Sequence, residues 1–365
     1  MRLADLDPTG LRFRTSAEVF GEMESACASN PDLASFETIG ESEEGRPVAG
    51  VVLGTGPRVV TLMAGAHADE PVGPETLRVL VLDGLAARGW GAPDGGLAAL
   101  FERFTFRIVP HVNPDAEARN AAWTSAFDAR RPVESLGLYL RHRLREAPGR
   151  DIEFAFPDRR LETAAATRFL FSDGPPALHA SLHGMGFSEG ALLLIDADHL
   201  AAPATEALRA GFRSAAAEAG LALHDHDRGG DKGFAYGGPG FTSTPRGRAM
   251  RDHFLARGDA ATAARFGLSS METAARVATD AGASAPLAVV TELPLFVFET
   301  PHDHTPGVPA LLHRWTELEP AVARAAVSGE SLAALAAPLG MRALSAEVAV
   351  RLHLRTLDLA LDALG

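Results

Sequence analysis

The sequence predicts an α/β fold in which a largely parallel sheet is covered by helices on both faces. Near-continuous apolar runs of strand length cover residues 59–67, 104–112, 177–183 and 287–293, as expected of strands buried on both faces. Stretches with helical spacing of apolar residues separate these runs, and strands that alternate with helices favour a parallel sheet between two helical layers. A chain of 365 residues, 46% of them hydrophobic, supplies a core of that size.

The remaining elements follow from local pattern. Polar residues 41–46 separate two strand-like runs and predict a hairpin. Pro71, Gly73 and Pro74 interrupt the pattern ahead of the helix that follows the first core strand. The segment 121–162 is arginine-rich and ambiguous. In chain order we expect helices at 16–29, 75–88, 200–220 and 271–279, strands at 35–39, 48–53 and 191–195, loops at 89–96 and 224–248, and two or three helices from 309 onward.

Composition excludes several classes of protein. The formal net charge of −13 argues against nucleic acid or an anionic membrane as the partner. Cys27 is the single cysteine, so neither an internal disulfide nor a cysteine-based zinc site is available. A metal site would have to use histidine and carboxylate. The first residues hold no apolar run of the signal-peptide type, and no later stretch resembles a membrane span. We therefore expect a cytoplasmic protein without a membrane partner.

The strongest chemical signal is the pair His67 and Glu70, which follows the first core strand. Both residues lie in the expected loop between that strand and the next helix. In open α/β sheets, ligands bind beyond the carboxyl ends of the strands. An imidazole and a carboxylate three residues apart can bind one ion, and they supply two of the three protein ligands of a catalytic zinc site. A surface loop without function is the alternative, because so short a motif also occurs by chance.

Two further polar residues lie on core strands. His183 ends the third run and is the best third ligand, giving a His₂Glu site with a fourth position for water. A buried structural histidine is the alternative, and His179, deeper on the same strand, is the substitute ligand. Glu292 lies in the last run. A buried carboxylate is costly, so Glu292 is either in a structural salt bridge or the general base that takes a proton from water.

Other motifs have weaker support. Residues 186–190 match the GxSxG pattern around Ser188, but a second apolar run follows where a serine-hydrolase elbow requires a helix. The histidines of 224–227 and 302–304 alternate with aspartates. This pattern is more typical of a solvated loop than of a metal site.

Four signatures together resemble the zinc carboxypeptidase family in both order and spacing. They are His67-x-x-Glu70, Asn113-Pro114-Asp115, His183-Gly184 and Thr291-Glu292-Leu293-Pro294. The resemblance implies an α/β/α sandwich with a mixed sheet. It also implies Zn²⁺ held by His67, Glu70 and His183, with Glu292 as general base and then proton donor.

The resemblance also implies an arginine that stabilises the oxyanion. Arg119 is the candidate, with Arg130 and Arg131 as substitutes, while Asn113 and Tyr236 are candidates for substrate binding. The chain departs from the family where an Asn-Arg pair normally binds the C-terminal carboxylate of the substrate. Glu153 and Phe154 occupy those positions. Phenylalanine cannot donate the paired hydrogen bonds of a guanidinium, and glutamate repels a carboxylate.

The sequence thus predicts a zinc-dependent amide hydrolase acting on a small peptide. The alternatives are a zinc-dependent deacylase of N-acyl amino acids, a serine esterase using Ser188 and a non-catalytic zinc-binding protein. We expect residues 1–308 to form the catalytic domain and 309–365 to form a helical extension packed on it.

Overall fold

The structure, a computed structural model, describes residues 2–87, 96–298, 305–330, 332–337 and 340–365. The strands are β1 (Ala34–Glu41), β2 (Pro47–Leu53), β3 (Arg58–Ala64), β4 (Phe104–Val109), β5 (Leu178–Ser188), β6 (Gly190–Ile195), β7 (Ala222–Leu223), β8 (Phe241–Ser243), β9 (Leu287–Val297) and β10 (Arg342–Ala343). The α-helices are α1 (Ser16–Ala28), α2 (Val72–Ala87), α3 (Gly96–Arg103), α4 (Pro114–Thr124), α5 (Pro132–His142), α6 (Leu161–Leu170), α7 (Glu206–Glu218), α8 (Gly247–Leu255), α9 (Ala260–Ala263), α10 (Ser270–Asp280), α11 (Ala310–Ser328), α12 (Ala333–Ala336) and α13 (Ala346–Asp362).

These strands form one mixed sheet in the order β1-β2-β4-β3-β5-β9-β6-β7, with β8 beside β6 and β10 beside β9. Its centre, β4-β3-β5-β9, is parallel. The expected hairpin is the antiparallel pair β1-β2 at one end. The parallel strands are connected by segments that contain helices, as the long crossover between parallel strands requires. The sequence-based fold class is therefore confirmed.

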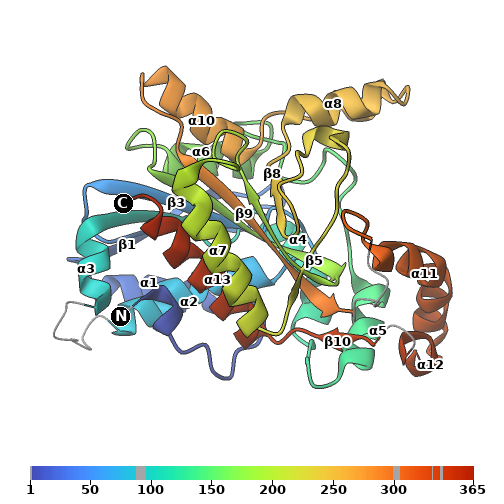
Figure 1. The fold of residues 1–365 in the computed structure, drawn as a ribbon. Coiled ribbons are helices and arrows are strands. Elements are labelled where there is room, and N and C mark those ends of the chain that lie inside the picture. The colour runs from blue at the N-terminus through green and yellow to red at the C-terminus, as the bar shows by residue number, and fades with distance from the viewer. Residues whose placement is uncertain (1, 88–95, 299–304, 331, 338–339) are drawn as a thin grey trace.

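Helices cover both faces of the sheet (Figure 1). Helices α2, α7 and α13 lie on one face, where Val60 and Leu62 of β3 pack with Leu77 and Leu80 of α2. Helices α6 and α10 lie on the other face, over a core that includes Met63. Successive residues of a strand point to opposite faces, so adjacent residues of β3 enter different cores. This explains why most residues of the strand are apolar.

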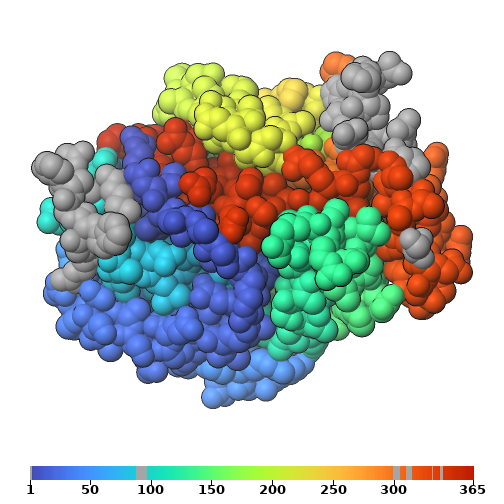
Figure 2. Space-filling view, turned by 90° about the horizontal axis from the view of Figure 1, so that it is seen from below, coloured from blue at the N-terminus to red at the C-terminus, as the bar shows by residue number. Residues whose placement is uncertain are grey.

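The two ends of the chain meet on one side of the molecule. The carboxylate of Asp358 in α13 accepts hydrogen bonds from the backbone N–H groups of Leu3 (3.1 Å) and Ala4 (3.0 Å). Figure 2 shows N-terminal residues in dark blue beside C-terminal residues in red. The C-terminal segment thus contributes α13 to a helical layer and β10 to the sheet. In the described part of the chain, no helix combines the length and apolar character needed to cross a membrane.

Several element boundaries differ from the sequence-based prediction. Strand β5 continues past His183 to Ser188, because β9 runs beside it to Val297. His183 therefore lies within a strand rather than at its end. Helix α2 begins at Val72 instead of residue 75. Pro74 fits its first turn because the missing N–H has no partner there in any helix. The loop expected at 89–96 lies almost wholly outside the described residues.

One buried histidine of β5 gives the protein a predictable response to acid. Burial lowers the pKa of His179 to about 3, while its Nδ1 lies 2.9 Å from the hydroxyl of Thr61. An unfolded histidine has a pKa of about 6.5. The contribution of the neutral ring to the unfolding free energy is therefore complete above pH 6.5 and is lost as the pH falls toward 3. Between these values the unfolded state binds one more proton, which lowers the unfolding free energy by about 1.4 kcal/mol per pH unit.

We expect His179→Gln to remove that slope. Urea unfolding of both proteins at pH 6, 5 and 4 should show the wild type losing up to about 1.4 kcal/mol more per pH unit than the variant. A constant offset between the two proteins is expected from the changed packing. If the unfolding free energies of the two proteins depend on pH in the same way, His179 is protonated in the folded state.

Candidate active site

The loop between β3 and α2 places His67 and Glu70. It begins at Gly65, whose φ is +77° and whose missing side chain leaves room for the ring of His111: a Cβ at Gly65 would lie 2.5 Å from that ring. At the start of α2, a Cβ at Gly73 would lie 2.1 Å from the carbonyl oxygen of Leu182. Only glycine, which has no Cβ, permits these contacts. Gly73 therefore allows the start of α2 to pack closely against β5, where His183 lies, and Gly65 allows the loop to pack against His111, which follows β4.

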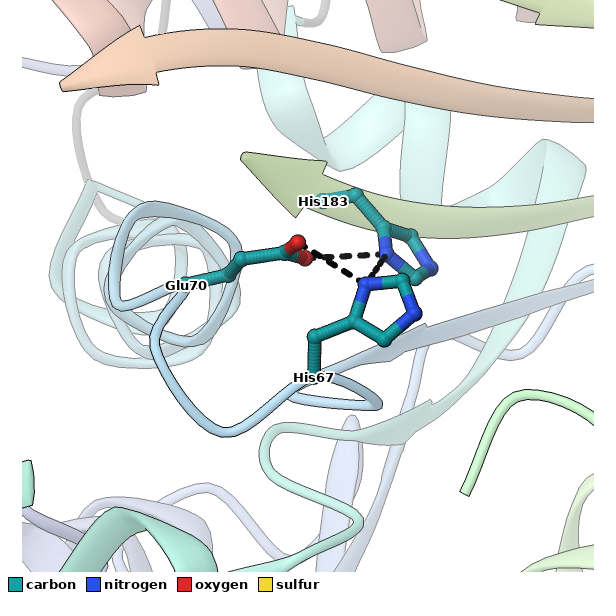
Figure 3. A group of neighbouring side chains, drawn as sticks. All are labelled: His67, Glu70 and His183. Carbon is teal, nitrogen blue, oxygen red and sulfur yellow. Dashed lines mark hydrogen bonds and ion pairs between the residues drawn. The ribbon is translucent and has the colours of Figure 1, made fainter. Parts of the chain in front are cut away.

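His67, Glu70 and His183 converge (Figure 3). The Nδ1 of His67 lies 2.8 Å from Glu70 Oε1, and the Nδ1 of His183 lies 3.0 Å from Glu70 Oε2. The two Nδ1 atoms are 3.1 Å apart. The backbone N–H of Gly184 also donates to Glu70 Oε2 at 3.2 Å. One loop and one strand, more than a hundred residues apart, thus bring three ligand-type side chains to one point.

These three side chains form a suitable site for one divalent ion. One ligand atom from each lies within 4.8 Å of the others, and in the described residues no other group of histidine, cysteine and acidic side chains converges in this way. Two imidazole nitrogens and one carboxylate oxygen are the donor set of catalytic zinc sites. The expectation that His67, Glu70 and His183 form one cluster is met, and His179 remains within the core.

Electrostatics link the same three residues. Burial alone lowers the pKa of His67, but the adjacent Glu70 carboxylate outweighs burial and raises it to about 10. The pKa of His183 is also raised, by Glu153 and Glu70 against the effect of burial. Burial raises the pKa of Glu70, and the two histidines outweigh it and lower that pKa well below its usual value. The histidines thus keep Glu70 in its carboxylate form, which is the form that binds a metal ion.

Glu292 lies beside this cluster. Residue 292 of β9 pairs in register with His183 of β5, so the two side chains are on the same face of the sheet. Both line a cavity of about 640 Å³, together with His67 and Glu70. Burial and the nearby Glu70 charge raise the pKa of Glu292 to about 8, and its Oε2 has no hydrogen-bond partner in the described residues. A carboxylate with a raised pKa and a free oxygen is suited to proton transfer.

Other predicted site residues lie outside the cavity lining. The side chain of Arg119 is 46% exposed on α4 and pairs with Glu44. Arg130 pairs with Asp128 and Arg131 with Glu134, both on the surface. The structure therefore does not bring these arginines to the cluster. Arg119 lies away from the cluster because the direction of α4 turns its side chain toward the hairpin turn that holds Glu44.

The two expected substrate-binding residues have local partners. Asn113 caps α4 by accepting from the N–H of Ala116 at 3.2 Å, and it donates to Glu146 at 2.8 Å. Because Glu146 lines the cavity, Asn113 lies directly behind the wall. Tyr236 donates to the carboxylate of Asp225 and does not line the cavity. Substrate binding by Asn113 and Tyr236 remains a prediction.

Ser188 does not have the geometry of a catalytic serine. Its hydroxyl is buried and lies 3.1 Å from Nδ1 of His224, and Glu189 Oε1 lies 3.0 Å from the same nitrogen. A serine triad uses the two different ring nitrogens for the serine and the acid. The histidines at 224 and 226 lie on the cavity wall, outside the ligand cluster. Residues 302–304 lie outside the described part of the chain.

Comparison with known protein families covers two of the three residues of the cluster, His67 and Glu70. The sequence profile of the zinc carboxypeptidase family matches residues 21–169. This segment belongs to that family. The zinc carboxypeptidase segment contains His67 and Glu70, and the structure adds His183 to complete the family's HxxE…H triad. The family consists of zinc-dependent hydrolases, so the resemblance found in the sequence is confirmed. No curated protein sequence matches the chain at a significant level.

Solved structures similar to this chain include two bacterial metallo-carboxypeptidases. The one from Burkholderia cenocepacia is 15% identical, with a TM-score of 0.48, and the match covers 95% of this chain and 67% of that chain. The one from Pseudomonas aeruginosa, in complex with (2-guanidinoethylmercapto)succinic acid, is 16% identical, with a TM-score of 0.48, covering 95% and 69%. Likeness at this level carries no argument about substrate.

Sequence reasoning missed the arginines that do line the cavity. Arg143 and Arg145 follow α5, in the segment that sequence pattern left ambiguous, and Arg228 lies in the loop after β7. Arg145 and the hydroxyl of Tyr139 both donate to Asp69 of the ligand loop, at 2.7 and 2.9 Å. The arginine content of 121–162 was the available signal, but its helices could not be placed against the sheet from pattern alone.

Proposed function

We propose that this protein is a zinc-dependent hydrolase that cleaves an amide bond in a small peptide or an N-acyl amino acid. The observation that carries the proposal is the position of Glu292, a half-buried residue whose Oε2 is buried without a hydrogen-bond partner in the described residues, next to the His67–Glu70–His183 triad in one cavity. Zinc held by the triad would supply Lewis acidity. Glu292 takes a proton from the attacking water and then donates it to the leaving nitrogen.

The segment that binds the substrate carboxylate in the family supplies no donor here. Phe154 is buried and packs against Phe266, with ring centroids 5.4 Å apart. Glu153 lies against His183, with Oε2 3.3 Å from Nε2. Neither side chain can bind a carboxylate, so any anionic group of the substrate must be bound elsewhere in the cavity.

Arg228 is the best candidate for that role. Two other cavity arginines have acidic partners: Arg143 lies 3.0 Å from Glu319, and Arg145 lies 2.7 Å from Asp69. The guanidinium of Arg228 lies 4.0 Å from the centroid of the Phe234 ring, and no ion pair links it to another described residue. Burial lowers its pKa. A stacked guanidinium keeps its donors free for a carboxylate.

We expect Arg228→Ala to raise KM about 10- to 100-fold for substrates with a free carboxylate, the loss expected for a charged hydrogen bond. KM for the same substrates with an amidated end should change little. Arg228→Lys should recover part of the affinity, and Arg248→Ala is the control, because Arg248 is exposed and lies outside the cavity lining. A fall in kcat with unchanged KM would instead place Arg228 at the reacting oxygen.

The function itself is tested with a panel of dipeptides beside a panel of N-acetyl and N-benzoyl amino acids. Release of amino acid is measured with and without a chelator. Chelator-sensitive hydrolysis of either panel supports the proposal, and the active panel separates peptidase from deacylase. Chelator-resistant hydrolysis that a serine-directed phosphonate blocks would support Ser188 instead. Bound zinc without turnover of either panel would contradict a hydrolase.

A further inference from the structure

Glu153 occupies a position fixed by its backbone neighbours. The N–H of Ile152 donates to the carbonyl of Ala66 at 3.4 Å, and the carbonyl of Phe154 accepts from the N–H of Gly267 at 2.6 Å. The Ile152 side chain is fully buried in the core beneath the ligand loop. Contacts on both sides thus hold residue 153 between the ligand loop and the segment that precedes α10. Its carboxylate is held at the wall of the cavity.

The carboxylate of Glu153 faces the side of His183 that points away from the cluster. His183 Nδ1 lies toward Glu70 and His67, whereas Nε2 lies 3.3 Å from Glu153 Oε2 and 2.8 Å from the hydroxyl of Ser181. A neutral imidazole that binds an ion through Nδ1 carries its proton on Nε2. That proton then lies on the side of the ring that Ser181 contacts at 2.8 Å and that faces the Glu153 carboxylate at 3.3 Å.

Glu153 has no other evident role in the described structure. Its residue is 5% exposed, and neither carboxylate oxygen has a hydrogen-bond partner in the described residues. A buried carboxylate that lacks compensating positive charge costs several kcal/mol. In the described residues the one ion-pair partner of Glu153 is His183, so compensation for its burial comes from the ligand cluster. The carboxylate is therefore coupled to the charge of the ligand cluster.

We propose that Glu153 is a positioning residue that orients His183 and strengthens its binding of the metal ion. An acceptor on the second nitrogen of a ligand histidine fixes the ring and increases its basicity, and its removal lowers metal affinity about 10- to 100-fold. The chain thus uses for metal binding a position that, by the resemblance, would bind the substrate. The inference rests on the metal site of the proposed function and not on the reaction.

The test is the affinity of the purified protein for Zn²⁺, measured by competition with a chromophoric chelator. Glu153→Gln keeps the shape of the side chain and removes its charge. We expect a dissociation constant about 10- to 100-fold higher than that of the wild type. Glu153→Asp, which keeps the charge at a greater distance, should lie between the two. If Glu153→Gln does not fold, Glu153→Asp alone decides the question.

Glu146→Gln is the matched control. Glu146 lines the same cavity but binds Asn113 and Arg160 rather than a ligand. Its substitution should leave zinc affinity within about threefold of the wild type. Equal affinity of the wild type and both Glu153 variants, or an equal loss in Glu146→Gln, would overturn the inference. Failure of the wild type to bind zinc would instead overturn the proposed function, so the two failures are distinguishable.

Discussion

Glu292→Gln is expected to lower kcat about 10²- to 10⁴-fold, the contribution of a positioned general base. Glutamine keeps the size of the side chain but cannot take a proton from water. Glu292 pairs in register with His183 and lines its cavity, but it is not one of the three converging ligands. The variant should therefore still bind one zinc ion per chain. Single-turnover hydrolysis and metal analysis of the same sample measure both quantities.

The exposed Glu206, which pairs with Arg209, provides the control. Glu206→Gln should keep wild-type kcat, because the residue lies on helix α7 and outside the cavity lining. Wild-type turnover by Glu292→Gln would remove Glu292 from the mechanism. Loss of zinc in that variant would make it a ligand instead of a base.

His67→Ala and His183→Ala are expected to reduce bound zinc from about one ion per chain to none after dialysis. Each substitution removes one of three protein ligands, and a catalytic site with two remaining ligands holds zinc weakly. Inductively coupled plasma mass spectrometry of dialysed protein measures the stoichiometry. Hydrolysis should disappear together with the metal.

His199→Ala is the matched control, because His199 is a histidine beside a carboxylate, Asp196, at 2.8 Å, yet does not line the cavity. This variant should retain its zinc. Full metal content in both ligand variants would show that the ion is bound by other residues.

The fold could be predicted because its core strands are apolar on both faces. Residues such as Leu62 and Met63 enter different cores, and this leaves a continuous apolar run that pattern detects. The location of His67 and Glu70 in a loop at the edge of the sheet could be predicted because they come at the end of that apolar run. The extension of β5 past His183 could not be predicted, because it depends on pairing with β9, more than a hundred residues away.

The basic residues of the cavity were beyond the reach of sequence pattern. Arg119 was a reasonable candidate because it follows Asn113 closely, but its partner Glu44 lies in a hairpin distant in sequence. Arg228 lies in a loop without periodicity, and only the folded chain places it on the same cavity as Glu292. Helix direction and loop path, rather than residue type, decide which guanidinium lies near the substrate.

The most direct test of the account is anomalous diffraction from crystals of the zinc-loaded protein, collected on both sides of the zinc absorption edge. We predict one strong difference peak, from a zinc ion bound by Nδ1 of His67, the carboxylate of Glu70 and Nδ1 of His183. A peak at other side chains, or no peak in crystals grown with excess zinc, would contradict the metal site on which the proposed chemistry depends.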